Sequence, residues 1–477
     1  MLFENPTTRR LASKWRMVVA ATTVVLLASA AFDSPTAEAR RLKPAKTPVT
    51  TTSTTSTTST TATRSTRVMG IDVSKYQHDT GKPIDWRRVK ASDQRFAFIK
   101  ATGGSNRVDP WFEREWVAAR RAGMITGAYH YADPSRSAVA QARLIVSVVG
   151  TTREANNLGI VLDLEDTGGL GPASLVRWAK SFLNEVQRLT GRVPILYTGP
   201  NFWKTRVRSS AFGAYPLWLA RYNSTPPAPL PGWNRWTFWQ YTSSGRIPGI
   251  PGHVDRNWFC CGVDALRGLA DGRSPRITRV WSSFGGASGR LGLPLGPETR
   301  VPGGWGQLFE NGYVAATNHG HFAITDAVWQ RYKASGGALG RLGVPISQAR
   351  VVAPGVTEQR FTAGRIVHAS ATGAFALRGP VLDRWVAEGG ATGRVGLPTA
   401  ELTQHGQQFT GGGLYVTPKG VRLVPGSIRD HYEELGGPTS FYGLPQGEVY
   451  EVLGGRAVDF ELGQLIEYEL AGQKVVV

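Results

Sequence analysis

The sequence predicts an α/β fold, with an irregular (β/α) barrel over residues 68–271 and a C-terminal array of four small repeats over residues 281–470. Two observations carry this prediction. Residues 68–271 alternate short apolar runs with segments of helical periodicity, which is typical of a mostly parallel sheet covered by helices. Residues 281–470 repeat one pattern of aromatic, glycine and proline about every 50 residues, which indicates an array of small units.

The N-terminus has the features of a secretion signal over residues 1–39. Basic residues precede an apolar run over 17–32, and small residues suited to cleavage stand at 28–30 and 37–39. The run is short for a spanning helix, so we expect no stable membrane span after cleavage. Residues 40–67 are rich in Thr and Ser, cannot bury a core, and are expected to form a flexible linker.

The barrel elements follow from local patterns. Asp109 and Pro110 are expected to start a helix that Gly123 closes, and apolar residues at helical spacing between Leu175 and Leu189 predict a second helix that Gly191 stops. The pattern predicts strands in seven segments, and seven or eight strands in about 200 residues suggest a compact barrel. The expected strands are 68–73, 96–101, 126–131, 159–164, 194–197, 217–222 and 237–241.

The four repeats share one frame. An aromatic residue stands four positions before a glycine, and a Gly-aliphatic-Pro turn follows seven residues after that glycine. We expect the aromatics to form the core of each unit and the turns to be structural. No acidic pair recurs, so this part favours binding or scaffolding over catalysis. The aromatics are Trp281, Tyr332, Trp385 and Tyr432, and the turns begin at Gly292, Gly343, Gly396 and Gly443.

The net charge of +20 is uneven, with +10 on residues 68–271 and only +3 on residues 272–477. A basic surface suits a polyanion such as a bacterial wall. No nucleic-acid motif accompanies it, so nucleic acid is not an expected partner. The two cysteines, Cys260 and Cys261, exclude a disulfide framework. Two interpretations fit them: a pair of small buried side chains, which we favour, or a strained disulfide between neighbours.

The apolar run at residues 159–164 ends in carboxylates. The strand period places Asp163 and Glu165 on one face, roughly 6–7 Å apart along the backbone. In α/β barrels the carboxyl end of the sheet carries the chemistry, and paired carboxylates are the usual equipment for cleaving a glycosidic bond. The alternative is a strand that runs out into solvent with hydrated acids.

Two further acids stand in suggestive places, Asp72 at the end of the first expected strand and Asp255 after a loop rich in Gly and Pro. Either one alone is commonly a turn or cap residue. Ten of the fifteen tryptophans fall in residues 68–271, and aromatic rings stack on the apolar faces of sugars. Many of these aromatics must be core, and we expect two or three to face a groove. The candidates are Tyr129, Tyr197, Trp218, Tyr222 and Trp239.

A series of motifs in this order resembles glycoside hydrolase family 25, the lysozymes that cleave the β-1,4 bond after N-acetylmuramic acid. The resemblance covers about residues 68–270 and implies an irregular α/β barrel that works without a metal or organic cofactor. Cys260-Cys261, close to Asp255, departs from the family pattern. The motifs are Gly70-Ile71-Asp72-Val73-Ser74, Asp85-Trp86, Phe98-Ile99-Lys100-Ala101-Thr102, Gly127-Ala128-Tyr129-His130-Tyr131, Asp163-Leu164-Glu165, Trp239-Gln240-Tyr241 and Val254-Asp255.

The resemblance implies roles for single residues. Glu165 matches the general acid, Asp163 its anionic neighbour, and Asp72 and Asp255 the other two active-site acids. Asp163 would either attack the sugar or orient the substrate's N-acetyl group, and spacing does not decide between these routes. Tyr129 and Tyr197 match aromatics near the site. The C-terminal array resembles LGFP repeats, with Leu or Val at the motif's third position, which implies retention at the cell wall through an unknown envelope component.

The sequence therefore predicts a secreted, wall-associated N-acetylmuramidase that acts on peptidoglycan glycan strands. Two alternatives stay open. An N-acetylglucosaminidase would share the carboxylate chemistry but leave a different reducing end. A non-catalytic wall-binding protein would keep the barrel without activity.

Overall fold

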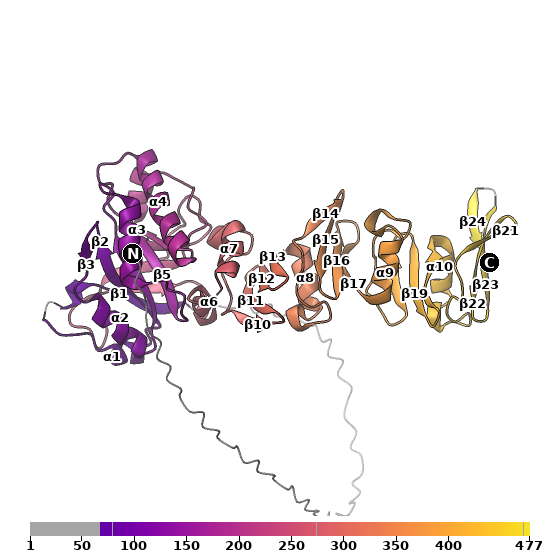
Figure 1. The fold of residues 1–477 in the computed structure, drawn as a ribbon, viewed down its shortest axis with the longest axis horizontal. Coiled ribbons are helices and arrows are strands. Elements are labelled where there is room, and N and C mark those ends of the chain that lie inside the picture. The colour runs from indigo at the N-terminus through magenta and orange to yellow at the C-terminus, as the bar shows by residue number, and fades with distance from the viewer. Residues whose placement is uncertain (1–66, 79, 273, 471) are drawn as a thin grey trace, which may run out of the picture. The chain divides into compact units, whose positions relative to one another are not determined.

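The computed structural model describes residues 67–78, 80–272, 274–470 and 472–477 (Figure 1). The expected signal at 1–39 and nearly all of the expected linker at 40–67 lie outside these residues. Among the helices described, none is both long and apolar enough to cross a membrane.

Eight strands close into a barrel in the order β1-β9-β8-β7-β6-β5-β4-β2, because β1 also pairs with β2. The seven strands expected from sequence are all present; the first has the expected bounds and the other six are shifted at one or both ends. An eighth, β9, was not expected, and it runs antiparallel to both neighbours. The barrel strands are β1 (Val68–Val73), β2 (Phe96–Gly103), β4 (Ile125–Tyr131), β5 (Asn157–Asp163), β6 (Ile195–Thr198), β7 (Leu217–Ala220), β8 (Phe238–Gly245) and β9 (Val254–Phe259); the short β3 (Arg107–Val108) pairs with the end of β2.

Both helices expected in the barrel are present. The second is α4, which begins at Pro172 and is capped by Gly191 in the left-handed conformation. The first, α2, begins at Phe112, later than Asp109-Pro110, since the Asp109 carboxylate accepts the Trp111 backbone N–H just before it. The barrel helices are α1 (Trp86–Ala91), α2 (Phe112–Arg121), α3 (Ala138–Val149), α4 (Pro172–Thr190), α5 (Pro200–Phe202) and α6 (Gly262–Leu269), with short helical turns at Lys75–His78 and Trp203–Val207.

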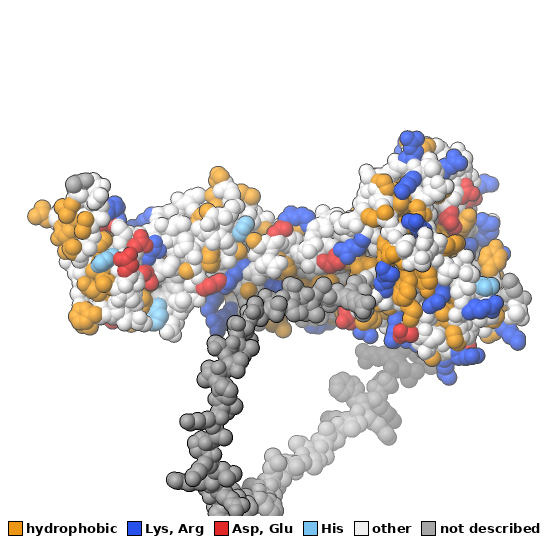
Figure 2. Space-filling model, turned by 180° about the vertical axis from the view of Figure 1, so that it is seen from behind, with side chains coloured by type: hydrophobic (Ala, Val, Ile, Leu, Met, Phe, Trp, Pro, Cys, Tyr) orange, Lys and Arg blue, Asp and Glu red, His pale blue; other side chains and the backbone are white. Residues whose placement is uncertain are grey.

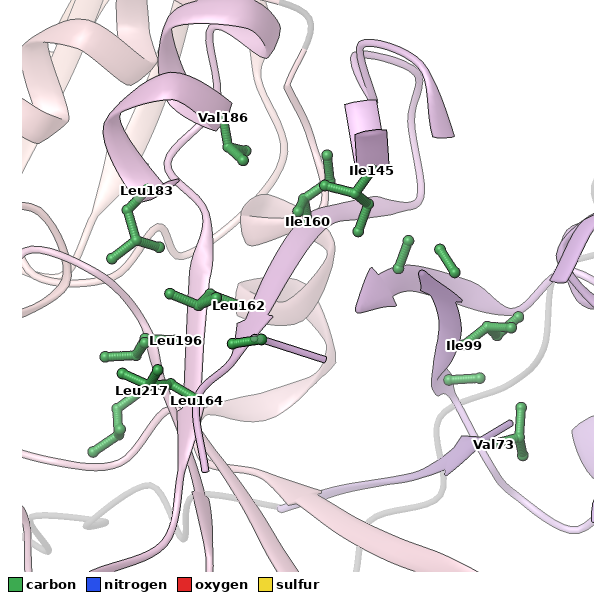
Figure 3. Close-up of a cluster of buried hydrophobic side chains, with 14 of the residues drawn as sticks. Val73, Ile99, Ile145, Ile160, Leu162, Leu164, Leu183, Val186, Leu196 and Leu217 are labelled. Atoms are coloured by element: carbon green, nitrogen blue, oxygen red, sulfur yellow. The ribbon is translucent and has the colours of Figure 1, made fainter. Parts of the chain in front are cut away.

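The period of two along each strand separates two cores. One set of aliphatic side chains faces the helices: Leu162 and Leu196 from strands gather with Ile145, Leu183 and Val186 from α3 and α4 (Figure 3). The alternate positions form a second, aromatic cluster that includes Phe96, Phe98, Val161, Tyr197, Trp218, Phe238 and Phe259. The same alternate positions, followed toward the strand ends, carry the polar residues of the candidate site.

The four C-terminal units each combine a helix with a small antiparallel sheet. The helix of a later unit packs against the sheets on either side of it, as α8 does against β13 and β17. The helices are α7 (Pro275–Ser283), α8 (Asp326–Ala334), α9 (Gly379–Ala387) and α10 (Gly426–Glu434). The strands are β10 (Thr299–Val301), β11 (Gly304–Phe309), β12 (Gly312–Thr317), β13 (Gly320–Thr325), β14 (Arg350–Ala353), β15 (Val356–Phe361), β16 (Gly364–Ala369), β17 (Gly373–Leu377), β18 (Gly406–Phe409), β19 (Gly412–Thr417), β20 (Gly420–Pro425), β21 (Tyr450–Val452), β22 (Gly455–Phe460), β23 (Gly463–Leu470) and β24 (Gln473–Val476).

The repeated aromatic residue is buried in every unit, as expected. Its indole N–H or hydroxyl donates a hydrogen bond to the glycine of the Gly-aliphatic-Pro turn. The indole N–H of Trp281 donates to the carbonyl of Gly292 at 2.8 Å, and the hydroxyl of Tyr332 donates to that of Gly343 at 2.8 Å. Trp385 and Tyr432 repeat the bond to Gly396 and Gly443. The shared sequence frame thus reflects one recurring contact between helix and turn.

Cys260 and Cys261 form a disulfide directly after β9, so the favoured interpretation of two unbonded buried side chains is wrong. Both residues are half-buried. The bond lies at the junction with α6, whose first residue is Gly262. Asp255 is the second residue of β9 and pairs in register with Asp72 of β1.

On the face shown in Figure 2, many Lys and Arg side chains are spread over the barrel among fewer Asp and Glu, and the repeats also carry both signs of charge.

Candidate active site

The four predicted acids come together at one end of the barrel. Asp163 is the last residue of β5, Glu165 follows two positions later, and Asp72 lies opposite Asp255 in the β1–β9 register. Asp163 is influenced electrostatically by both Glu165 and Asp72, and Glu165 by Asp255. The structure thus places the acids as two interacting pairs, Asp163 with Glu165 and Asp72 with Asp255.

Asp72 is held by two amide donors. The carboxylate is 5% exposed, and its Oδ2 accepts from Gln240 Nε2 at 2.9 Å and from Asn257 Nδ2 at 2.8 Å. Burial raises the pKa of Asp72 well above its ordinary value, the charge of Asp255 raises it further, and the two amide donors oppose the shift. Burial also raises the pKa of the half-buried Asp255, and its contact with Asp72 lowers it.

Buried aromatic donors fix the orientation of both amides. Trp218 Nε1 can only donate, and it donates to Asn257 Oδ1 at 2.7 Å, which turns the amide nitrogen of Asn257 toward Asp72. Tyr197 donates its hydroxyl to Gln240 Oε1 at 3.0 Å with the same effect on Gln240. The orientation of Asp72 is therefore set by a hydrogen-bond network.

Asp163 and Glu165 have different surroundings. Asp163 is 6% exposed, and its Oδ1 is buried without a hydrogen-bond partner, whereas Glu165 is exposed to solvent. Burial and then the charge of Glu165 raise the pKa of Asp163 well above its ordinary value, while Lys100 opposes the rise. Partial burial also raises the pKa of Glu165, and Asp163 and Lys100 lower it. Two close carboxyls with raised pKa values favour a state in which the pair shares a proton.

The predicted aromatic ligands divide into three groups. Tyr222 is 59% exposed and Tyr129 is half-buried, so both present surface at the site. Tyr197 is buried but reaches the site through its bond to Gln240. Trp218 and Trp239 are 2% and 1% exposed and offer no free ring face to a sugar, so the structure gives both indoles a packing role.

Sequence reasoning missed Gln240, Asn257 and Lys100 as site residues. Lys100 lies over the rings of Tyr129 and Tyr131, with its Nζ 5.7 Å and 4.8 Å from their centroids. Lys100 and Gln240 belong to the motifs that carry the family resemblance, so the resemblance could have identified them as candidate site residues. Asn257 carried no signal beyond its place two residues after Asp255.

Comparison with known proteins supports the same family. The model of glycosyl hydrolases family 25 matches residues 71–250, and the LGFP repeat model matches 291–340, 342–393 and 396–440. The fourth structural unit extends beyond the last LGFP match. These two models match the barrel and the array separately.

Several proteins are similar to the barrel. An uncharacterised Escherichia coli protein, YegX, is 40% identical over 210 residues, which cover 43% of this chain and 74% of the relative. Lysozyme M1 of Streptomyces globisporus is 36% identical over 214 residues, or 43% of this chain and 71% of the relative. The crystal structure of a Streptomyces coelicolor lysozyme is 35% identical and covers 43% of this chain and 98% of its own, with a TM-score of 0.42. The chain belongs to glycosyl hydrolases family 25, and it is a glycoside hydrolase whose barrel is followed by LGFP repeats.

Proposed function

We propose that this protein is a secreted muramidase that hydrolyses the β-1,4 bond between N-acetylmuramic acid and N-acetylglucosamine in peptidoglycan. The observation that carries the proposal is the carboxyl pair at the end of β5, one member buried with a free oxygen and the other open to solvent. Relatives named lysozyme and N,O-diacetylmuramidase share the barrel sequence. The site needs no group beyond this chain's own side chains for the steps below.

Glu165 is the proposed general acid. Its accessible carboxyl reaches a substrate, and its raised pKa favours the protonated form that must donate to the leaving glycosidic oxygen. As the C–O bond breaks, positive charge develops at the anomeric carbon, which the anionic surroundings stabilise. The resulting Glu165 carboxylate then accepts a proton from the water that attacks the same carbon.

Asp163 is proposed to act through the substrate's acetamido group. Its partnerless Oδ1 can accept the acetamido N–H, which positions the carbonyl oxygen to attack the anomeric carbon and form an oxazolinium ion. Water then opens this ion and restores the N-acetyl group. Direct attack by Asp163 would instead form a glycosyl ester.

Asp72 and Asp255 are proposed to supply negative charge and hydrogen bonds to the sugar. The double donation to Asp72 fixes that carboxylate before substrate arrives. Tyr129 and Tyr222 are proposed to line the groove, Tyr222 with its exposed ring, and Tyr197 to position Gln240 through its hydroxyl. Trp218 is proposed to act indirectly, by positioning Asn257.

Digestion of purified peptidoglycan with the full chain tests the reaction. The fragments are reduced with borohydride and analysed by mass spectrometry. Muramitol ends are expected; glucosaminitol ends would identify an N-acetylglucosaminidase. No new ends on any wall would favour a non-catalytic wall-binding protein.

We further propose that the LGFP units hold the enzyme at the cell wall. The stability of a stacked array is approximately a sum of unit and interface terms, so an end unit can be removed without disrupting the contacts within the other units. Removing the last unit, residues 426–477, should lower the fraction of Glu165→Gln protein that sediments with insoluble walls. Equal sedimentation of both forms would contradict the role. Secretion is tested by sequencing the N-terminus of protein from the culture medium, which should begin near residue 31 or 40.

A further inference from the structure

A cavity of about 630 Å³ lies beside the acid pair. It is bordered by the turn after β1, the end of β2 and the loop leading into β3, and Tyr131 closes it from β4. Tyr131 and Lys100 connect it to the catalytic site, because Tyr131 lies beside Asp163 in the register of β4 and β5, and Lys100 lies beside Tyr129 in the register of β2 and β4. A substituent on a sugar bound at the acid pair would therefore reach this cavity.

The lining of the cavity is cationic. Lys75, Lys100 and Arg107 contribute three positive charges, with Asn106 as a neutral polar neighbour. The acid in the lining, Asp109, is 9% exposed and already engaged, since its carboxylate accepts the backbone N–H groups of Lys75 and Trp111, each at 3.0 Å. The three cations and one acid give the lining a net charge of +2.

Arg107 stands out among these cations. Its Nε donates to the carbonyl of Gly103 at 3.4 Å, and its guanidinium forms no ion pair with a carboxylate of the described residues. Arg107 also borders a second cavity of about 500 Å³, which adds Arg136 and Asp133 to the lining. The Asp133 carboxylate accepts the backbone N–H and hydroxyl of Ser135. The Arg107 guanidinium keeps donors free for a ligand.

We propose that this cavity binds the anionic substituent of the muramyl residue, the carboxylates of the stem peptide attached through its lactyl group. The sugar rings and N-acetyl groups of the glycan strand carry no charge that requires three cations, whereas the substituent of the muramyl residue beside the scissile bond is a peptide with free carboxylates. A guanidinium binds a carboxylate through two parallel hydrogen bonds, and lysine adds a point charge. The inference rests on the proposed muramidase function and specifies which form of the substrate the enzyme prefers.

Arg107→Ala tests the proposal, and Arg177→Ala on the exposed face of α4 is the matched control, because it removes the same charge from a side chain that lines neither cavity. The substrates are soluble glycan strands with stem peptides, the same strands whose peptide carboxylates are capped as methyl amides, and strands whose peptides an amidase has removed, which carry the free lactyl carboxylate in their place. Loss of a charge-assisted bond should lower kcat/KM of Arg107→Ala roughly tenfold on peptide-bearing strands. The preference for peptide-bearing over capped strands should shrink accordingly, and Arg177→Ala should keep the parent's preference.

Equal losses on all three substrates would show that Arg107 contacts the sugar, and unchanged kinetics on peptide-bearing strands would show that the cavity binds no carboxylate; either overturns the proposal. Calorimetry with free muramyl pentapeptide and Glu165→Gln protein gives a second readout that needs no hydrolysis. Weaker binding after Arg107→Ala supports the proposal, and equal binding overturns it. Failure of the parent to cleave any strand would count against the muramidase function alone.

Discussion

Replacing Asn257 with leucine should damage the site and the fold together. Asn257 is fully buried and joins Trp218 to Asp72 through bonds of 2.7 Å and 2.8 Å. Leucine has a similar size but neither donates nor accepts. The variant leaves the indole N–H without an acceptor and removes one of the two amide donors to Asp72.

The size of the effect follows from these two bonds. An orphaned buried donor costs about 1–3 kcal/mol, and a hydrogen bond to a carboxylate is worth about 1.5–3 kcal/mol. Burial of the additional apolar surface of leucine stabilises the folded state by roughly 1 kcal/mol. We expect the free energy of unfolding to fall by about 2–4 kcal/mol. Because the amide donors lower the pKa of Asp72, losing one raises it, and the acid limb of the pH–rate profile should move to higher pH.

Urea unfolding and a pH series of kcat/KM measure the two effects. Trp218→Phe and the double variant complete a mutant cycle, in which the double variant should be about 1 kcal/mol less destabilised than the sum, because no indole N–H is left unpaired. An unfolding free energy within 0.5 kcal/mol of the parent and an unmoved acid limb would refute the network.

Three further outcomes are expected. Burial raises the pKa of Asp163, so ionising this group in the folded protein at neutral pH costs stability; Asp163→Asn should raise the unfolding free energy at pH 7 by roughly 0.5–2 kcal/mol, a gain that disappears at low pH as the parent's carboxyl is protonated. Tyr332→Phe removes the hydroxyl bond to Gly343 and should lower the free energy of unfolding, measured in urea, by about 1 kcal/mol. An unchanged free energy of unfolding would argue against the contact between helix and turn that the units share. Thiol titration of the unfolded, unreduced protein should detect no free thiol, and two after reduction; free thiols before reduction would contradict the Cys260–Cys261 bond.

The sequence predicted the parallel part of the barrel well, because buried parallel strands appear as continuous apolar runs. All seven residues of β5 are buried, which is why its apolar run was visible. β9 was missed because Val254–Phe259 includes charged and amide residues whose partners lie on β1 and β8, far away in the chain. The repeats were predictable because one contact recurs in a fixed frame.

The site was only partly predictable. The acids were identified because burying carboxylates at the end of an apolar strand costs desolvation free energy, and a catalytic role accounts for keeping them there. The amides of Gln240 and Asn257 bear no charge, and their bonds to Asp72 span 168 and 185 residues of sequence. Trp218 and Trp239 were candidates for sugar binding because they are aromatic residues on or beside predicted strands. The sequence could not show that both indoles are buried.

The most direct test of the central claim compares Glu165→Gln with Asp166→Asn, a neighbouring exposed carboxylate outside both pairs. The assay is the release of reducing ends from purified peptidoglycan, with thermal unfolding as the control for folding. Loss of a general acid should lower the rate by about 10²–10⁴-fold in Glu165→Gln, at an unfolding temperature no lower than the parent's, while Asp166→Asn stays within about twofold of the parent. Glu165→Gln that cleaves as fast as the parent would contradict the assignment of the acid.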